Sequence, residues 1–97
     1  MRAQRRDNNE SALVRLARQV GAKVIYMQAG QGCDFLLLSP GKISIIEVKD
    51  GRKSPSERRL TADEMELALT CQTLHIPYHV ILNEGDLMRV LEQNGKP

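Results

Sequence analysis

The sequence predicts an α/β fold in which a central mixed sheet of four strands is flanked by helices, in the order αβββαβα. Two β-rich runs flank a Pro-Gly turn, segments with helical spacing of apolar residues precede and follow them, and one further β-rich run separates the last two helices. A chain of 97 residues is sufficient for one core. We therefore expect a single domain over residues 1–97.

Three helices are expected. The first runs from about Asp7 to Val20, where Gly21 follows as a C-cap. The second opens with the capping box Thr61–Glu64 and ends near Leu74, and a short third helix covers Glu84–Glu92. The residues expected to face inward are Ala12, Leu13, Leu16, Ala17, Val20, Leu87, Val90 and Leu91, with a Leu60–Met65 contact at the start of the second helix.

Four strands are expected, at Lys23–Gln28, Cys33–Leu38, Lys42–Lys49 and Ile76–Leu82. The second and third form a hairpin, because Pro40 and Gly41 suit the two central positions of a type II turn. Apolar residues on both faces of this hairpin indicate central strands covered on both sides. Ala29–Gly32 is expected to be a loop, and Asp50–Glu57 a polar, mobile connection.

The hairpin turn brings two acids together. Residues whose numbers sum to 81 should pair, which places Asp34 opposite Glu47, about 5 Å apart at Cβ. Such a like-charge pair is destabilising unless a cation offsets it, and Lys49 lies on the same face. Oxygen ligands of this kind suit Mg²⁺, with Mn²⁺ as a substitute, and the implied reaction is phosphodiester hydrolysis. Alternatively, Asp34 caps the glycine loop and Glu47 pairs with Lys49 at an exposed strand end.

These residues have the pattern of a known family. Glu10, the segment Gly30-Gln31-Gly32-Cys33-Asp34-Phe35-Leu36, the triplet Glu47-Val48-Lys49 and Leu60-Thr61 resemble the PD-(D/E)XK nucleases, most closely their virus-type replication-repair (VRR-NUC) branch, over nearly the whole chain. The resemblance implies a restriction-endonuclease-like αβββαβ core and Mg²⁺-dependent cleavage of structured DNA. For stand-alone phage members it also implies homodimers that resolve four-way Holliday junctions.

By position in the motif, Asp34 and Glu47 correspond to metal ligands, the Val48 carbonyl to a further ligand and Lys49 to the catalytic lysine. Glu10 corresponds to the helix carboxylate that completes the acidic site. Cys33 departs from the motif, since it stands where the family usually has Pro.

Two helix residues, Glu10 and Gln72, have explanations that do not require a role in the active site. Glu10 follows Asp7 by three residues, as in a helix cap, and both roles can hold together. Gln72 falls seven residues after Met65 on the expected buried stripe, where it either faces the site or bonds to backbone. His75 and His79 are not assigned to the site.

Basic residues cluster despite a net charge of only +2, at Arg2, Arg5 and Arg6 and again from Lys49 to Arg59. Such patches suit a polyanion, although solvated loop charge is an equal alternative. Aromatic residues make up 3%, which argues against base-stacking platforms. The candidate DNA contacts are Gly30, Gln31, Gly32, Arg52, Lys53, Arg58 and Arg59, although the two glycines serve equally well simply to make a turn.

Cys33 and Cys71 lack metal-binding spacing and are expected to be free thiols in a reducing compartment. No apolar run is long enough for a membrane span, so the expected location is the cytoplasm, that of a bacterial host if the chain is phage-encoded. The competing functions are a non-catalytic DNA-binding or interaction module and a nuclease for flaps or duplex DNA. Sequence-specific duplex cleavage is disfavoured because so short a chain has little surface for major-groove readout.

Overall fold

The computed structural model describes residues 8–94, with side chains from 9 to 93. Its elements are α1 (Asn8–Gln19), β1 (Lys23–Tyr26), β2 (Phe35–Ser39), β3 (Lys42–Val48), the 3₁₀ turn η1 (Pro55–Arg58), α2 (Ala62–Leu74), β4 (Tyr78–Ile81) and α3 (Glu84–Asn94). The strand order is β1-β2-β3-β4, and only the β3–β4 pair is parallel. The predicted α/β class, mixed sheet and element order are confirmed. Asp7, Arg2, Arg5 and Arg6 lie outside the described residues.

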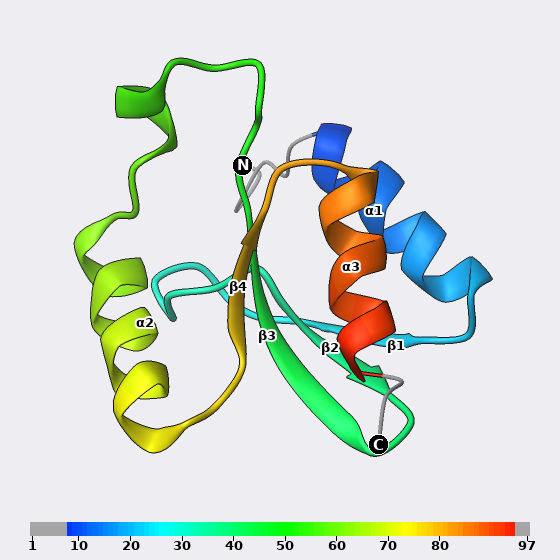
Figure 1. Cartoon of the computed structure of the whole chain (residues 1–97). Coiled ribbons are helices and arrows are strands. Elements are labelled where there is room, and N and C mark those ends of the chain that lie inside the picture. Colours follow the sequence, from blue (N-terminus) through cyan, green and yellow to red (C-terminus); the bar gives the residue numbers. More distant parts are fainter. Residues whose placement is uncertain (1–7, 95–97) are drawn as a thin grey trace.

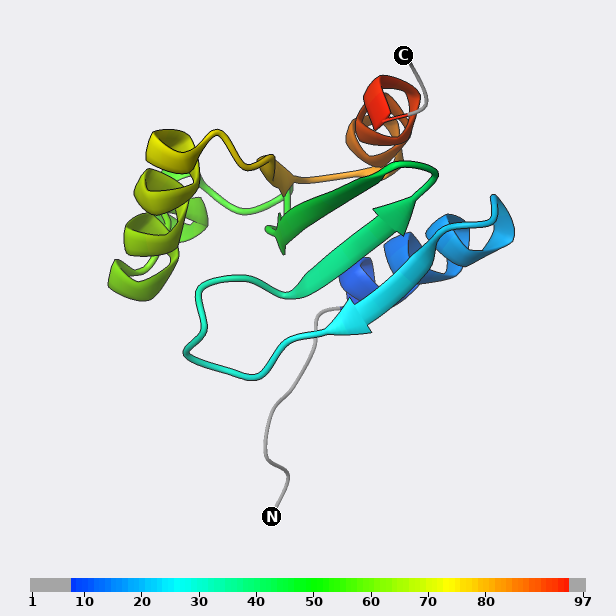
Figure 2. The ribbon, with the colours of Figure 1, turned by 90° about the horizontal axis from the view of Figure 1, so that it is seen from below.

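The helices are divided between the two faces of the sheet. α1 and α3 lie together on one face, and α2 lies on the opposite side beside β4 (Figures 1 and 2). The core fills the space between the sheet and the α1–α3 pair. Its members are Leu13, Val14, Ala17, Ala22, Val24, Phe35, Leu37, Ile46, Val48, Ile81, Leu87 and Val90.

The hairpin register is the predicted one. Phe35 pairs with Ile46 and Ser39 with Lys42, so residue numbers sum to 81 along the whole β2–β3 ladder. Gly41 takes a φ of +76°, the left-handed conformation that a Pro-Gly type II turn requires. Burial alternates along β2, where Phe35 and Leu37 are fully enclosed.

The opposite face of the sheet is less covered than expected. Ile43 is 55% exposed and Val80 is 41% exposed, while Leu36, Leu38 and Ile45 are half-buried. The prediction of a sheet covered on both sides is therefore wrong for this face, because one helix covers only its β4 side.

The inward stripes of two helices are each shifted from the predicted ones. In α1, Val14 is buried whereas Ala12 is exposed, and Val20, which follows the last residue of α1, is 50% exposed. In α2, the less exposed positions are Glu64, Leu67, Ala68 and Cys71, which follow helical spacing. Met65 and Gln72 are exposed, so the predicted stripe of α2 was wrong by one residue. The inward residues of α3, Leu87, Val90 and Leu91, are as predicted.

The connection between β3 and α2 contains more structure than the polar loop that was expected. Ser54 and Glu57 form a capping box around η1, and Arg52 pairs with Asp50. The predicted Thr61–Glu64 capping box is confirmed at the start of α2. Within the described residues, no helix combines the length and apolarity that crossing a bilayer requires.

Candidate active site

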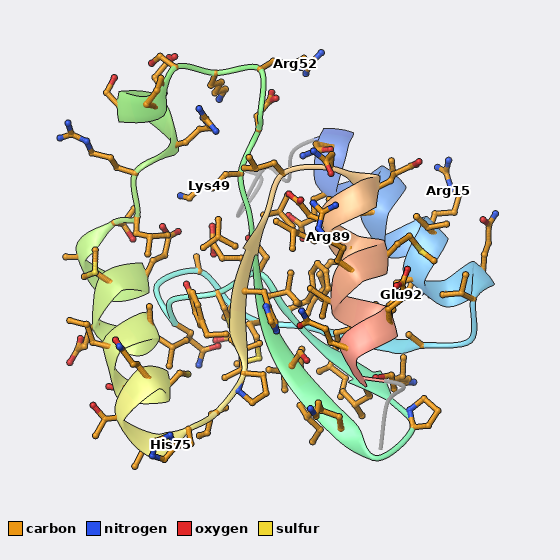
Figure 3. All side chains as sticks on the ribbon, viewed as in Figure 1. Arg15, Lys49, Arg52, His75, Arg89 and Glu92 are labelled. Carbon is orange, nitrogen blue, oxygen red and sulfur yellow. The ribbon has the colours of Figure 1, made fainter. Side chains whose placement is uncertain are left out.

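The candidate site lies where β2 begins and β3 ends, on the side of the sheet that faces α2. Asp34 directly precedes β2, Glu47 and Val48 end β3, and Lys49 follows. Lys49 extends from the end of β3 toward the α2 side, whereas Arg52 points outward from the connection that follows (Figure 3). Three of the predicted side chains therefore gather at one end of the hairpin.

Asp34 and Glu47 are close but do not form a ladder pair. The ladder ends at Phe35–Ile46, and beyond it the Asp34 N–H donates to the Ile46 carbonyl at 2.9 Å. The Asp34 carboxylate turns toward β3 and accepts the Val48 N–H at 2.7 Å. The predicted directly opposed geometry is thus wrong in detail, because Asp34 lies outside the strand. Its charge nevertheless acts on Glu47.

Glu47 is buried, with only 4% of its surface exposed. Burial, the negative charge of Asp34 and the contact with Glu64 together raise the pKa of Glu47 from 4.5 to about 9. Of the alternative interpretation, the Glu47–Lys49 ion pair is confirmed at 3.6 Å, but the strand end that carries it is buried rather than exposed. A buried acid that faces another acid is an environment that a bound cation would relieve.

Lys49 bridges two carboxylates. Its Nζ lies 2.8 Å from Glu64 Oε1 and 3.6 Å from Glu47 Oε2, with 14% of the lysine side chain exposed. Burial opposes the charge on Lys49, but the hydrogen bond to Glu64 and the two nearby carboxylates outweigh it and raise the pKa of the lysine. Lys49 is therefore an ammonium ion at neutral pH.

Glu64 is a member of this cluster that the sequence interpretation missed. The sequence explains it as the acid of the capping box of α2, yet its carboxylate also holds Lys49. Burial opposes its ionisation, but hydrogen bonds from Lys49 and Thr61 keep the pKa of Glu64 below its ordinary value. The signal for its inward position was its helical spacing to Leu67 and Cys71.

Comparison with protein-family models, curated proteins and solved structures found no match. Function is therefore inferred from the residues and their geometry.

Glu10 lies in the first turn of α1, which approaches the same end of β3. It is 3% exposed and shares the inward stripe of α1 with Leu13, Val14 and Ala17. The neighbouring Asn9 amide donates to the carbonyls of Lys49 at 3.2 Å and Leu82 at 3.1 Å. These bonds anchor the start of α1 beside the candidate site.

The glycine loop packs against α2. Gly32 has a φ of +92°, and a Cβ at this position would lie 2.8 Å from the Asp63 carbonyl oxygen and 2.9 Å from Leu67 Cβ. Its own carbonyl accepts the Tyr78 hydroxyl at 2.9 Å. Packing thus accounts for Gly32, which is buried, whereas Gly30 and Gln31 are exposed.

The remaining predicted DNA contacts lie on the β3–α2 connection. Arg52, Lys53 and Arg59 are exposed, and Arg58 is half-buried. Arg52 is paired with Asp50, and it borders a surface hollow that Asn9 and Asn83 also line. The connection therefore presents positive charge next to the end of β3.

Cys33 and Cys71 are buried free thiols. Burial and the charges of Glu47 and Asp34 raise the pKa of Cys33 to about 11, so it is a neutral, unreactive neighbour of the acids. Among residues 8–94, no three His, Cys, Asp or Glu side chains are arranged as a ready-made metal site. In this arrangement the Lys49 ammonium lies against two of the acids.

Proposed function

We propose that this protein is a metal-dependent endodeoxyribonuclease of the PD-(D/E)XK type that cuts branched DNA as a homodimer. The observation that carries the proposal is the cluster at the end of the hairpin: the Asp34 carboxylate 2.7 Å from the Val48 nitrogen, buried Glu47, and Lys49 Nζ 3.6 Å from Glu47. The same three side chains carry the motif in the sequence.

The donor set fits a hard divalent cation. Asp34 and Glu47 supply carboxylate oxygens, the Val48 carbonyl is adjacent in the chain, and Glu10 is buried on the helix whose first turn lies beside them. Mg²⁺ prefers oxygen ligands and keeps several waters, so a few protein ligands suffice. When bound, Mg²⁺ or Mn²⁺ would lower the pKa of a water molecule and stabilise the charge that builds on the phosphoryl group.

Lys49 has a separate role in this proposal. Since its pKa is raised, it carries a positive charge at neutral pH and is no general base. An ammonium ion at this position can hold a phosphate oxygen and offset the negative charge of the transition state. Asp34 and Glu47 supply the carboxyl groups of the site, and because burial raises the pKa of Glu47 to about 9, a bound cation would have to displace its proton.

The basic connection between β3 and α2 is the proposed DNA surface. Arg52, Lys53, Arg58 and Arg59 lie on the stretch of chain that follows Lys49 directly. Phosphate contacts from such a surface would hold DNA next to the acids without reading sequence. The preference for a four-way junction and the homodimer rest on the resemblance to stand-alone phage nucleases.

A cleavage panel tests this proposal. Labelled linear, nicked, flap, fork and four-way substrates are incubated with the protein and Mg²⁺, and we expect paired cuts in the four-way junction ahead of the others. Preferential cutting of flaps would keep the chemistry but change the substrate. Binding of all substrates with no cutting in Mg²⁺ or Mn²⁺ would favour the non-catalytic module.

A further inference from the structure

The shortest contact of the Lys49 ammonium is with a residue outside the motif. Glu64 Oε1 accepts it at 2.8 Å, whereas Glu47 Oε2 lies at 3.6 Å, beyond ordinary hydrogen-bond length. The side chains of Lys49 and Glu64 are only 14% and 15% exposed. A charge-assisted bond with little access to water is much stronger than an ion pair on the open surface.

Glu64 is itself held in place by the capping box of α2. The Oε1 atom that binds Lys49 also accepts the Thr61 N–H at 2.8 Å, and Thr61 Oγ1 accepts the Glu64 N–H at 3.3 Å. The first turns of α2 are in turn packed against Gly32. Glu64 is thus a carboxylate with its orientation set by backbone contacts.

We propose that Glu64 is a positioning residue that holds the Lys49 ammonium beside Glu47. Lysine has a long flexible stem, so fixing its end in advance removes part of the cost of ordering it during catalysis. Glu64 also competes with Glu47 for the ammonium, whose nearest carboxylate oxygen is Glu64 Oε1. The capping box therefore serves both the helix and the active site. This role depends on the proposed nuclease function.

The chain contains a matched control. Ser54 and Glu57 form a second capping box, in which Glu57 Oε1 accepts the Ser54 N–H at 3.1 Å. Glu57 is exposed, and its hydrogen bonds go to Ser54. Glu57→Ala therefore removes a capping-box carboxylate at an exposed position, whereas Glu64→Ala removes one that also binds Lys49.

Two measurements on the full chain test the proposal. The first is kcat and KM on a branched DNA substrate with Mg²⁺. We expect Glu64→Ala to lower kcat by about tenfold or more with KM changed less than about threefold, and Glu64→Gln to recover part of the loss. Glu57→Ala, which lies on the proposed DNA surface, should leave kcat within about twofold of wild type whatever its effect on KM. Glu64→Ala with the wild-type kcat would overturn the proposal.

The second measurement needs no activity. The ¹H–¹⁵N signal of the Lys49 ammonium, assigned with Lys49→Arg, reports how well its protons are held. We expect a signal in wild type and Glu57→Ala that broadens in Glu64→Gln and disappears in Glu64→Ala.

Gln still supplies a side-chain oxygen at the helix cap, so if Glu64→Ala does not fold, the Lys49 signal of Glu64→Gln tests the positioning role. A signal unchanged by either Glu64 substitution would refute the positioning role. If wild type cuts no DNA while the signal depends on Glu64, the nuclease proposal fails and the contact stands.

Discussion

The Asp34 carboxylate accepts a 2.7 Å hydrogen bond from the backbone N–H of Val48, the residue between Glu47 and Lys49. The bond joins the chain just before β2 to the last residue of β3, beyond the point where the ladder between the two strands stops. One acid of the site is therefore held by the backbone that carries the other. Asp34 has a structural contact in addition to its proposed role as a metal ligand.

Asp34→Asn separates these two roles. Asparagine keeps an oxygen for the Val48 N–H but loses the negative charge, so we expect a folded protein whose cleavage rate falls by at least about 100-fold, since loss of even an outer-shell contact costs 10–100-fold at metal sites. Electrophoretic binding to a four-way junction should be retained. Asp63→Asn, at an exposed carboxylate in the first turn of α2, is the control. Normal cutting by Asp34→Asn would show that this carboxylate is no ligand.

Glu47 makes stability depend on pH. Its pKa is about 9 in the folded protein and near 4.5 when unfolded, so its contribution is fully present below pH 4.5 and is lost as the pH rises toward 9. Glu47→Gln mimics the neutral form and should raise Tm above that of wild type by a margin that grows from pH 5 to pH 9, reaching at least about 4–8 °C, the shift that 1 kcal/mol gives in a domain of this size. Calorimetry across this range, with the exposed Glu66→Gln as control, measures it. A margin independent of pH would contradict the assigned environment.

Substitutions at Gly32 and Gly41 distinguish the stability cost of overpacking from the cost of a left-handed backbone. Both Gly32 and Gly41 have positive φ, but a Cβ at Gly41 meets nothing within 4 Å, whereas one at Gly32 meets the backbone of α2. Gly41→Ala should cost about 1–2 kcal/mol for the left-handed backbone alone. Gly32→Ala should cost about 1–3 kcal/mol more, because the overpacked site must shift α2. Urea unfolding compares them, and equal costs would mean that the loop does not press on α2.

Charge reversal tests the proposed DNA surface. Arg58→Glu with Arg59→Glu should weaken junction binding at low salt and flatten the plot of log K against log[salt] by about 1.8, the slope expected for two lost phosphate contacts. Arg15→Glu on the exposed side of α1 changes charge far from the connection and serves as the control (Figure 3). A parallel salt plot for the Arg58/Arg59 variant would remove these residues from the interface.

The hairpin shows what local sequence can predict here. Pro40 and Gly41 define the turn, and the turn defines the register, so the pairing of Phe35 with Ile46 follows from the sequence. The convergence of Asp34 and Glu47 follows as well, but their direct opposition does not. Asp34 lies outside the ladder, and its carboxylate accepts the Val48 N–H. This contact depends on the folded structure and cannot be predicted from the alternation of residues along a strand.

The helices show why the rest of the site was not predictable. Glu64 has a sufficient local explanation as a capping-box residue, and only the docking of α2 against Gly32 and β4 reveals its second contact. The inward face of α2 is short of large apolar residues, so its stripe was misplaced by one position toward Met65 and Gln72. Glu10 and Glu64 each begin an inward stripe, and burial distinguishes such acids from surface caps.

The central claim is that a divalent cation held by Asp34 and Glu47 drives phosphodiester cleavage. The most direct measurement incubates wild type and Asp34→Asn with an end-labelled four-way junction in Mg²⁺, in Mn²⁺ and in EDTA. We expect cleavage only by wild type and only with a divalent cation present. Equal nicking in EDTA, or equal nicking by the Asp34→Asn variant, would contradict the account.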